Sequence, residues 1–271
     1  MLDFDKIDEW APIMGAVLEG VVPIAARSKL AEVKLRFVED ARELLFAICD
    51  REAIVDRMLL WVQASTIVGF HGTRLTDSEV MSVQSRGLLK LKAESRRLRL
   101  ERALSSHPRW PEVAPRLAAA IRKHGPGACT GRREGEAHLT LSRSSLVKGS
   151  NHYIVYGAEF DQNVACSLLG SDGEELLAAD GLPRLVLVAV PGEAALNACH
   201  RFRSMYEMRE RGDVPNMVRE FITAWAYRLA CPAASRGPYY PDCGMVFEAN
   251  ISPEWLLEIE TLHGPSSEQR S

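Results

Sequence analysis

The chain has 271 residues, of which 46% are apolar and 25% charged, and its formal net charge is −3. This composition is typical of a globular protein with a buried core, and the small negative charge excludes a global positive field for nucleic acid or membranes. No apolar run approaches the roughly 20 residues that cross a bilayer, and the acidic start MLDFDKIDEW is unlike a secretory signal. We expect a cytoplasmic protein without a membrane partner.

The first 65 residues are predicted to form a helical region. Residues 29–65 place apolar side chains three and four positions apart and contain neither Gly nor Pro. We expect this region to pack beside a second domain over 66–262. The polar segment 263–271 is expected to be a flexible tail.

A strand that turns quickly into a helix is predicted next. The β-branched and aromatic run Thr66–Phe70 indicates the strand, and His71 follows at its end. Thr76 and Glu79 have the spacing of a capping box, and Gly87 suits the position just after a helix. The helix between them would have about ten residues.

The later elements are helices clustered between strands. They are a helix over 91–106, a second between Pro111 and Gly125, a strand over 138–142, a segment over 151–170 that starts extended and becomes helical after Gly157, a buried strand over 184–192, an amphipathic helix over 215–230, and a strand over 244–255 that runs into a short helix. This pattern favours an α+β fold with an appended helical region.

The cysteines do not point to a metal or disulfide framework. They are Cys49, Cys129, Cys166, Cys199, Cys231 and Cys243, and no two form a C-x-x-C pair. Scattered cysteines fit reduced thiols in a cytoplasm. A zinc site from Cys231, Cys243 and a histidine lacks the close ligand pairs of structural zinc, so we expect no metal.

His71 is the residue from which a chemical interpretation starts. A histidine at a strand end presents a donor and an acceptor above the sheet edge, and Gly72 lets a ligand approach the backbone closely. Thr73 adds a hydroxyl, and Arg74 adds a planar cation suited to phosphate. The alternative interpretation is a hydrogen-bonded structural histidine at a turn.

Three segments resemble the motifs of one enzyme family. FHGT (70–73), followed by a helix and GLL (87–89), resembles the first motif of the poly(ADP-ribose) polymerase-like ADP-ribosyltransferases of the His-Tyr-Glu type. HLTLSRSSLVKGSNHY (138–153) is similar to the second motif, and DCGMVFEANISPEW (242–255) to the third. The resemblance covers roughly residues 66–160 and 182–260. It implies a split, mixed or antiparallel β-sheet that binds NAD as co-substrate.

The resemblance also implies roles for the matching residues. His71 would hydrogen-bond a ribose of NAD, and the backbone of Gly72 would hold the nicotinamide amide. Tyr153 would stack on the nicotinamide ring, with Tyr156 as an alternative. The NAD-contacting candidates of these motifs are Gly72, Thr73, Arg74, Ser142 and Tyr156.

The family's glutamate has no match at its usual position, where Asp242, Cys243 or Gly244 stands. Glu159, at the turn into a helix, and Glu248, in the last strand, are the candidate carboxylates. In ordinary roles Glu159 would interact with a helix N-terminus and Glu248 would face water. In catalysis a carboxylate would stabilise the oxocarbenium-like ribose, an aromatic ring would hold the leaving nicotinamide, and a histidine would fix the ribose.

The basic stretch from Arg86 to Arg102 has two interpretations, which extend to Arg132 and Arg133. Balanced by Glu94 and Glu101, it is a solvated helix face. As a groove, it would neutralise the phosphates of NAD or of a nucleic acid.

The sequence thus predicts a bacterial, NAD-dependent mono-ADP-ribosyltransferase that modifies a protein or nucleic acid. By analogy it would be a toxin or phage-defence effector with an antitoxin or regulatory partner. Two alternatives stay open: a non-catalytic module that binds NAD or ADP-ribose, and an enzyme like the RNA 2′-phosphotransferases.

Overall fold

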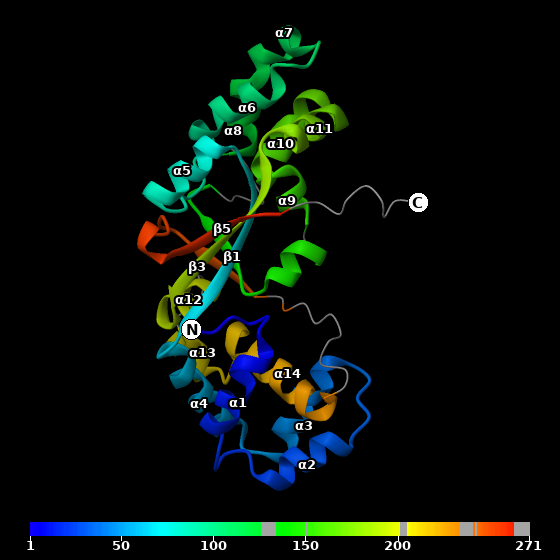
Figure 1. Cartoon of the computed structure of the whole chain (residues 1–271), viewed down its shortest axis with the longest axis vertical. Coiled ribbons are helices and arrows are strands. Elements are labelled where there is room, and N and C mark those ends of the chain that lie inside the picture. The colour runs from blue at the N-terminus through cyan, green and yellow to red at the C-terminus, as the bar shows by residue number, and fades with distance from the viewer. Residues whose placement is uncertain (126–133, 150, 201–204, 233–240, 242, 263–271) are drawn as a thin grey trace. The chain divides into compact units, whose positions relative to one another are not determined.

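The computed structural model describes residues 1–125, 134–149, 151–200, 205–232, 241 and 243–262. It combines helices with a five-stranded antiparallel sheet of strand order β4-β2-β1-β3-β5. Figure 1 labels three neighbouring strands of this sheet, β1, β3 and β5. The predicted α+β class is confirmed. The expected tail over 263–271 lies outside the described residues.

The strands are β1 (Thr66–Leu75), β2 (Ala137–Thr140), β3 (Leu182–Pro191), β4 (Gly244–Phe247) and β5 (Leu256–Thr261). β3 and β5 pair antiparallel, with Arg184 opposite Thr261 and a register shift between Leu187 and Val188. The sequence analysis did not predict the strand β5. Its last predicted elements were the strand and short helix over 244–255. The exposed and half-buried residues of β5 do not alternate clearly, so the pattern that marks a strand is weak there.

The α-helices are α1 (Ile7–Val17), α2 (Ile24–Glu32), α3 (Val38–Ile48), α4 (Arg51–Gln63), α5 (Asp77–Arg86), α6 (Arg97–Leu104), α7 (Trp110–Val113), α8 (Leu117–His124), α9 (His152–Tyr156), α10 (Glu159–Leu169), α11 (Ser171–Ala179), α12 (Gly192–Cys199), α13 (Met205–Glu210) and α14 (Asn216–Ala230). The first 65 residues are therefore helical, as predicted. So is the segment 215–230.

The prediction that the first strand ends at Phe70 is wrong. β1 continues to Leu75, so His71 lies inside a strand and not at its end. β1 is bordered by β2 on one side and β3 on the other, and Gly72, Thr73 and Leu75 are buried. Paired neighbours on both sides keep the backbone extended even where the side chains are polar.

The predicted capping of α5 is confirmed. Thr76 Oγ1 accepts from the Glu79 backbone N–H at 3.3 Å, and Glu79 Oε2 accepts from the Thr76 backbone N–H at 2.8 Å. Gly87 ends the helix at φ +77°, and a Cβ there would lie 1.9 Å from the Ile251 carbonyl oxygen. The glycine therefore allows the close bridge between Leu88 and Ile251.

The prediction that the segment 151–170 starts extended is wrong. His152–Tyr156 forms the short helix α9, which Gly157 ends at φ +89° before α10 begins. A single helical turn has too few residues for a clear periodic pattern, so the sequence does not reveal it.

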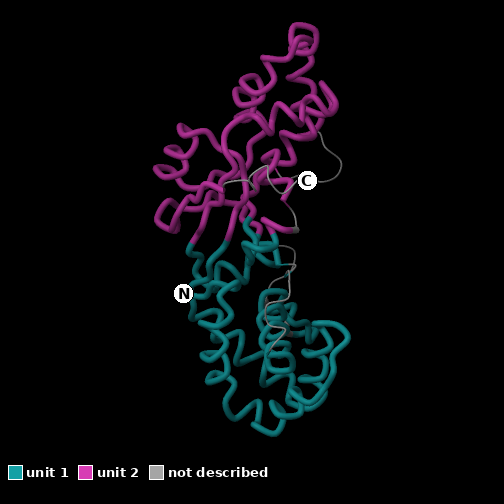
Figure 2. Tube along the Cα trace, turned by 45° about the vertical axis from the view of Figure 1, so that its right-hand side comes forward, with its two compact units in different colours: residues 1–69, 139–145, 189–245 teal, residues 70–138, 146–188, 246–271 magenta. Residues whose placement is uncertain are grey.

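The chain folds into two compact units (Figure 2). Unit 1 contains residues 1–69, 139–145 and 189–245, and unit 2 contains residues 70–138, 146–188 and 246–271. The helical region 1–65 is thus part of unit 1 together with segments much later in the chain. This division differs from the boundary expected at residue 65.

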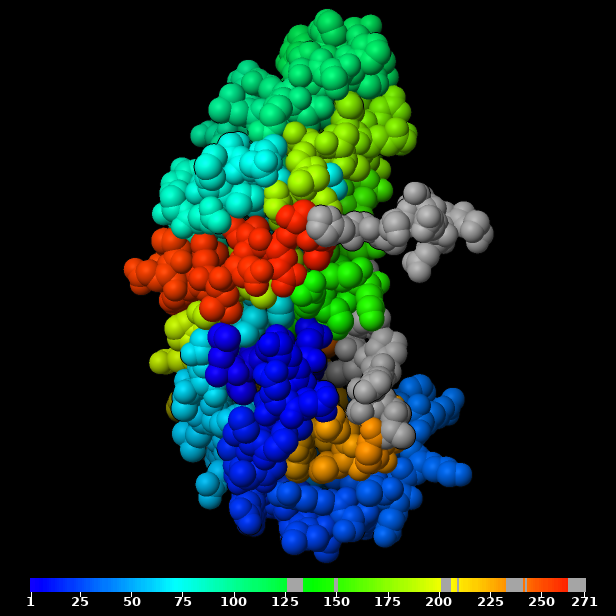
Figure 3. Space-filling model, viewed as in Figure 1, coloured from blue at the N-terminus to red at the C-terminus, as the bar shows by residue number. Residues whose placement is uncertain are grey.

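The core of unit 1 is built around α14. The ring of Phe221 lies 5.3 Å from that of Phe4, 5.0 Å from Trp10 and 5.8 Å from Trp61. These aromatic contacts join the N-terminal helices to α14, and the space-filling view shows α14 in orange between them (Figure 3). Residues 1–65 therefore share their core with residues 216–230.

Unit 2 has a second core where α6, α8, α10 and α11 meet. It includes Leu100, Leu104, Ile121, Val164 and Leu177, all buried. This helical core carries α9 and α10, which hold the predicted residues Tyr153 and Glu159.

Candidate functional site

His71 is half-buried on β1 and donates its Nδ1–H to the carbonyl oxygen of His138 at 2.8 Å. Burial lowers the pKa of His71 to about 4; the hydrogen bond to His138 opposes this, while the charges of His138 and Arg96 add to it. The imidazole is therefore neutral near pH 7, with Nε2 as a hydrogen-bond acceptor.

Gly72 is where α9 packs closely on β1. A Cβ at this position would lie 3.0 Å from Ile154 Cγ1 and 3.4 Å from Leu146 Cδ2. Arg74 reaches the same helix, because its Nη1 lies 3.5 Å from the Ile154 carbonyl oxygen. Since strand residues alternate, Gly72 and Arg74 face α9, whereas His71 and the buried Thr73 face the other side of the sheet.

Arg74 is held by the backbone. Its Nη2 donates to the Gly181 carbonyl at 2.6 Å and its Nε to the Asp180 carbonyl at 3.3 Å. Burial lowers its pKa, and the charge of Arg99 adds to this while Asp180 acts against it. These contacts fix Arg74 in place, and its role as a phosphate ligand stays a prediction.

The structure joins two of the predicted catalytic residues. Tyr153 donates its hydroxyl hydrogen to Glu159 Oε1 at 2.9 Å, and His152 Nε2 lies 3.4 Å from the same oxygen. The rings of His152 and Tyr153 have centroids 4.0 Å apart. Glu159 is the first residue of α10, where the helix dipole favours a carboxylate. The turn at Gly157 brings the end of α9 to this position.

The prediction that Glu248 lies in the last strand is wrong. β4 ends at Phe247, and Glu248 is exposed beyond it. Its backbone carbonyl accepts from Lys90 Nζ at 3.0 Å. The chain leaves the sheet here because Asn250 and Ile251 pair with the segment after Gly87 instead. The carboxylate hydrogen-bonded to Tyr153 is that of Glu159.

Two further candidates lie in different surroundings. Ser142 is buried in unit 1, where its hydroxyl donates to Asp5 Oδ1 at 2.8 Å and lies 2.7 Å from Ser144 Oγ. Tyr156 is half-buried at the end of α9, three residues after Tyr153 and so on a neighbouring part of the helix face. Tyr156 therefore lies on the same helix, α9, as Tyr153, whereas Ser142 does not.

The central arginines of the basic stretch, Arg96 and Arg99, form neither a solvated helix face nor a groove open to phosphates. Arg96 bonds Asp161, and Arg99 lies 3.1 Å from Glu79 Oε1 and 3.3 Å from Asp161 Oδ2. Asp161 is fully buried and Arg99 is 4% exposed, so these are internal ion pairs. Burial acts to raise the pKa of Glu79, but Arg99 and other partners outweigh it and the pKa is lowered. Arg132 and Arg133 lie outside the described residues.

The sequence analysis did not identify a pair formed by His138 on β2 and Glu136, the residue just before that strand. His138 Nε2 lies 2.8 Å from Glu136 Oε2, and their side chains are 29% and 10% exposed. A signal existed in the spacing, because residues two apart along an extended segment lie on one side of it. Glu136 stands just before the predicted strand over 138–142, so the strand pattern does not include it.

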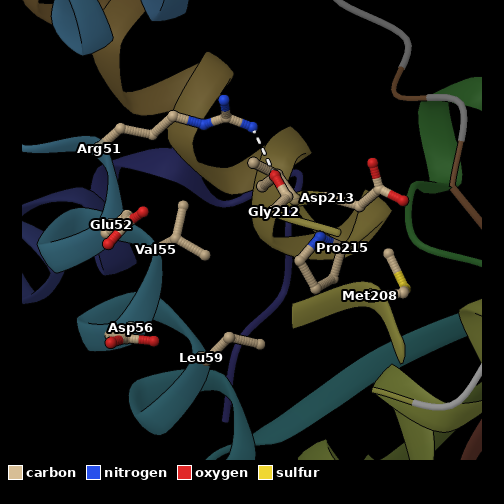
Figure 4. A pocket seen from close by; sticks show the side chains of 10 residues that line it. Arg51, Glu52, Val55, Asp56, Leu59, Met208, Gly212, Asp213 and Pro215 are labelled. Carbon is tan, nitrogen blue, oxygen red and sulfur yellow. Dashed lines mark hydrogen bonds between the residues drawn. The ribbon is translucent and has the colours of Figure 1, made fainter. Parts of the chain in front are cut away.

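Unit 1 has a cavity of about 290 Å³ (Figure 4). Its lining includes Arg51, Val55, Asp56 and Leu59, and Arg51 Nη2 donates to the Gly212 carbonyl at 2.8 Å across its edge. No residue predicted for the NAD site lines this cavity. It therefore does not bear on that prediction.

The described cysteines are free thiols. Cys199 and Cys243 have their sulfurs 3.5 Å apart, and this contact together with burial raises the pKa of Cys243. Cys129 and Asp242 lie outside the described residues. Within the part of the chain that the structure describes, no three His, Cys, Asp or Glu side chains are grouped to hold a metal ion.

The helices of the described ranges include none with the length and apolar character needed to span a bilayer. Comparisons with protein-family models, curated proteins and solved structures found no match.

Proposed function

We propose that the chain is an NAD-dependent mono-ADP-ribosyltransferase of the polymerase-like type, acting in a bacterial cytoplasm. The five-stranded sheet would be the family's split-sheet core. The observation that carries the proposal is the hydrogen bond between Tyr153 and Glu159, which joins an aromatic ring and a carboxylate at one helix N-terminus. The resemblance calls for a tyrosine ring on nicotinamide and a carboxylate beside its ribose; it puts that carboxylate on the late strand of the third motif, and Glu159 would take its role here.

Glu159 would stabilise positive charge on the ribose as the bond to nicotinamide breaks. The N-terminus of α10 favours its ionised form, and the Tyr153 hydroxyl fixes its orientation. The Tyr153 ring would hold the departing nicotinamide. His152, beside the same oxygen, is a further polar contact that the resemblance does not assign.

His71 would act as a neutral hydrogen-bond acceptor for a ribose hydroxyl. Its Nδ1–H is taken by the His138 carbonyl, which leaves Nε2 for this contact. Strand alternation turns His71 away from the face of β1 on which α9 packs. His71 therefore faces away from the Tyr153–Glu159 pair, and the test that follows bears on the pair alone.

The test measures nicotinamide released when the purified protein is incubated with NAD. We expect Glu159→Gln to lose roughly 100-fold or more of the rate, as for loss of one group that stabilises transition-state charge. Glu248→Gln is the matched control and should retain the rate, because Glu248 is exposed beyond β4. Equal rates in wild type and Glu159→Gln would contradict the assignment of the carboxylate.

A second outcome distinguishes enzyme from binding module. NAD binding by calorimetry without nicotinamide release would favour the non-catalytic module, and absence of binding would overturn the proposal. If nicotinamide is released, labelled NAD incubated with protein and nucleic-acid acceptors identifies the class that is modified. The role as toxin or phage-defence effector, with its antitoxin or regulatory partner, is proposed only by analogy.

The 2′-phosphotransferase alternative receives less support. It calls for arginines that are open to a phosphate, whereas Arg96 and Arg99 are engaged with the buried Asp161. Arg74 is held by backbone carbonyls.

A further inference from the structure

Cys199 and Cys243 bring two sulfur atoms into contact although they stand 44 positions apart in the chain. Both residues belong to unit 1, and their Sγ atoms lie 3.5 Å apart. The bond of a disulfide is about 2 Å long, so the two sulfurs would have to approach by roughly 1.5 Å. Rotation of one side chain moves its sulfur by a distance of this order. Joining the pair therefore does not require the chain to unfold.

The backbone holds the two cysteines differently. Cys199 is the last residue of α12, and helix ends fray because their final carbonyls have no partner within the helix. Cys243 stands directly before β4, and its carbonyl accepts the Leu141 backbone N–H at 3.0 Å. Cys199 is therefore the residue that moves, and Cys243 is the fixed partner.

Solvent reaches the two thiols unequally. Cys199 is half-buried, whereas Cys243 is 1% exposed. The contact with Cys199 and burial raise the pKa of the Cys243 thiol; the charge of Glu220 adds to this, and that of Arg219 acts against it. Cys243 therefore stays protonated near neutral pH and is a poor first nucleophile. A small oxidant meets Cys199 first.

We propose that Cys199 and Cys243 form a peroxide-sensitive site that closes to an intramolecular disulfide. The Cys199 sulfur attacks one oxygen of hydrogen peroxide and the O–O bond breaks. The departing hydroxide takes up the proton that Cys199 loses and leaves as water, so Cys199 becomes a sulfenic acid. The Cys243 sulfur then attacks the Cys199 sulfur, the S–O bond breaks, and the second hydroxide leaves as water with the Cys243 proton. Two thiols are oxidised and one peroxide is reduced to two waters.

Two other uses of paired thiols fit these residues less well. A structural zinc ion takes four ligands, and within the described ranges no third His, Cys, Asp or Glu side chain completes a group with the two sulfurs. A purely structural contact would need no difference in access, whereas one thiol here is reachable and the other is shielded. An accessible cysteine beside a second, resolving cysteine is the arrangement of redox-sensitive sites.

The disulfide would close a loop that contains α14, the helix at the centre of the core of unit 1. Linking two residues far apart in the chain restricts the unfolded chain more than the folded one. The oxidised protein should therefore be more stable than the reduced protein. This inference does not depend on the proposed function, because neither thiol takes part in the proposed transfer.

The experiment starts from the reduced full chain. It is treated with hydrogen peroxide, the remaining thiols are blocked with N-ethylmaleimide in urea, and a digest without reductant is analysed by mass spectrometry. We expect two peptides joined through Cys199 and Cys243, lighter by two hydrogens than their reduced sum and separated by dithiothreitol. Peroxide added to the urea-unfolded chain should give mixed pairings, because the contact between the two sulfurs is then lost.

Variants test the order of the two steps. Cys243→Ser should stop the reaction at the sulfenic acid of Cys199, which dimedone traps, and Cys199→Ser should give neither product. Cys166→Ser is the matched control, because Cys166 is an exposed thiol in unit 2. It should form the Cys199–Cys243 disulfide as the wild type does.

Urea unfolding provides an independent readout. Peroxide should lower the unfolding equilibrium constant of the wild type by about 100-fold, a typical effect of a disulfide, and should leave that of Cys199→Ser unchanged. The inference is wrong if both thiols of the wild type still react with maleimide after Cys166 has been oxidised. It is also wrong if Cys199 goes on to sulfinic acid without a cross-link, or if either cysteine pairs elsewhere. The mapping of the wild type decides this even if a variant does not fold.

Discussion

A histidine that stays neutral in the folded chain makes stability depend on pH. The pKa of His71 is lowered from 6.5 to about 4, so the unfolded chain takes up a proton at higher pH than the folded one. Between these two values the unfolded state binds more protons, and the free energy of unfolding falls as the pH is lowered. Above this window the contribution is constant.

His71→Asn should remove this part of the pH dependence. The asparagine amide N–H can keep the hydrogen bond to the His138 carbonyl, but it does not titrate. Urea unfolding of wild type and variant, measured across the window from pH 6.5 to about 4, gives the comparison. Parallel stability curves for the two proteins would show that His71 is not the neutral group described.

Any side chain at Gly87 should destabilise the fold in two ways, through its positive φ and through a clash with the neighbouring backbone. An alanine there adds the strain of φ +77° and places its Cβ 1.9 Å from the Ile251 carbonyl oxygen. Gly135 is the matched control, because it has φ +85° with nothing within 4 Å of the added Cβ. We expect Gly135→Ala to cost about 1–2 kcal/mol and Gly87→Ala to cost clearly more, by denaturant unfolding. Equal losses would contradict the contact.

The range of an interaction along the chain decides whether the sequence reveals it. Thr76 and Glu79 are three residues apart, and their capping box could be predicted because its geometry is local. Arg96 and Asp161 are 65 residues apart, so their pairing depends on where α10 lies and could not be read from the basic stretch. Residue type and spacing therefore indicate which side chains carry chemistry, whereas their distant partners depend on the fold.

At the scale of elements, the ion pairs around α6 and α10 should contribute strongly to the stability of unit 2. Asp161→Asn leaves the guanidinium groups of Arg96 and Arg99 without their buried partner. Breaking one side of a buried ion pair typically costs about 3–5 kcal/mol. The free energy of unfolding from urea titration should fall by this order.

Arg97→Ala is the control for this comparison. Arg97 Nε lies 2.8 Å from Glu101 Oε1 one helical turn away, and the Arg97 side chain is mostly exposed. An exposed pair at this spacing contributes only about 0.3–0.5 kcal/mol. Comparable losses for Arg97→Ala and Asp161→Asn would mean that the pairs at Asp161 are solvated.

Strand and helix lengths were the least predictable features at this scale. The polar residues His71 to Arg74 suggested a turn, but β1 continues because β2 and β3 border it on both sides. Conversely, α14 could be predicted in full. Its apolar residues recur at helical spacing over 15 residues. This pattern is visible in the segment itself, without knowledge of the elements that pack against it.

For the whole molecule, the two compact units alternate along the chain. Each unit is assembled from three segments, and residues 1–69 belong with 189–245 in unit 1. The sequence suggested a boundary at residue 65 because the residue pattern changes there from helical to strand-like. A change of local pattern does not show which distant segments share a core, and the contacts of Phe221 with Phe4 and Trp10 supply that information.

A fragment of residues 66–262 therefore should not fold like the full chain. It retains α14 but lacks Phe4, Trp10 and Trp61, whose rings pack on Phe221. The apolar face of α14 would be left exposed, and a large exposed apolar face promotes aggregation. We expect the full chain to elute as one species in size-exclusion chromatography and the fragment to aggregate or lose α-helical circular dichroism. A fragment that elutes as a compact species and unfolds at the temperature of the full chain would favour the boundary at residue 65, because the N-terminal helices would then contribute nothing to the core around α14.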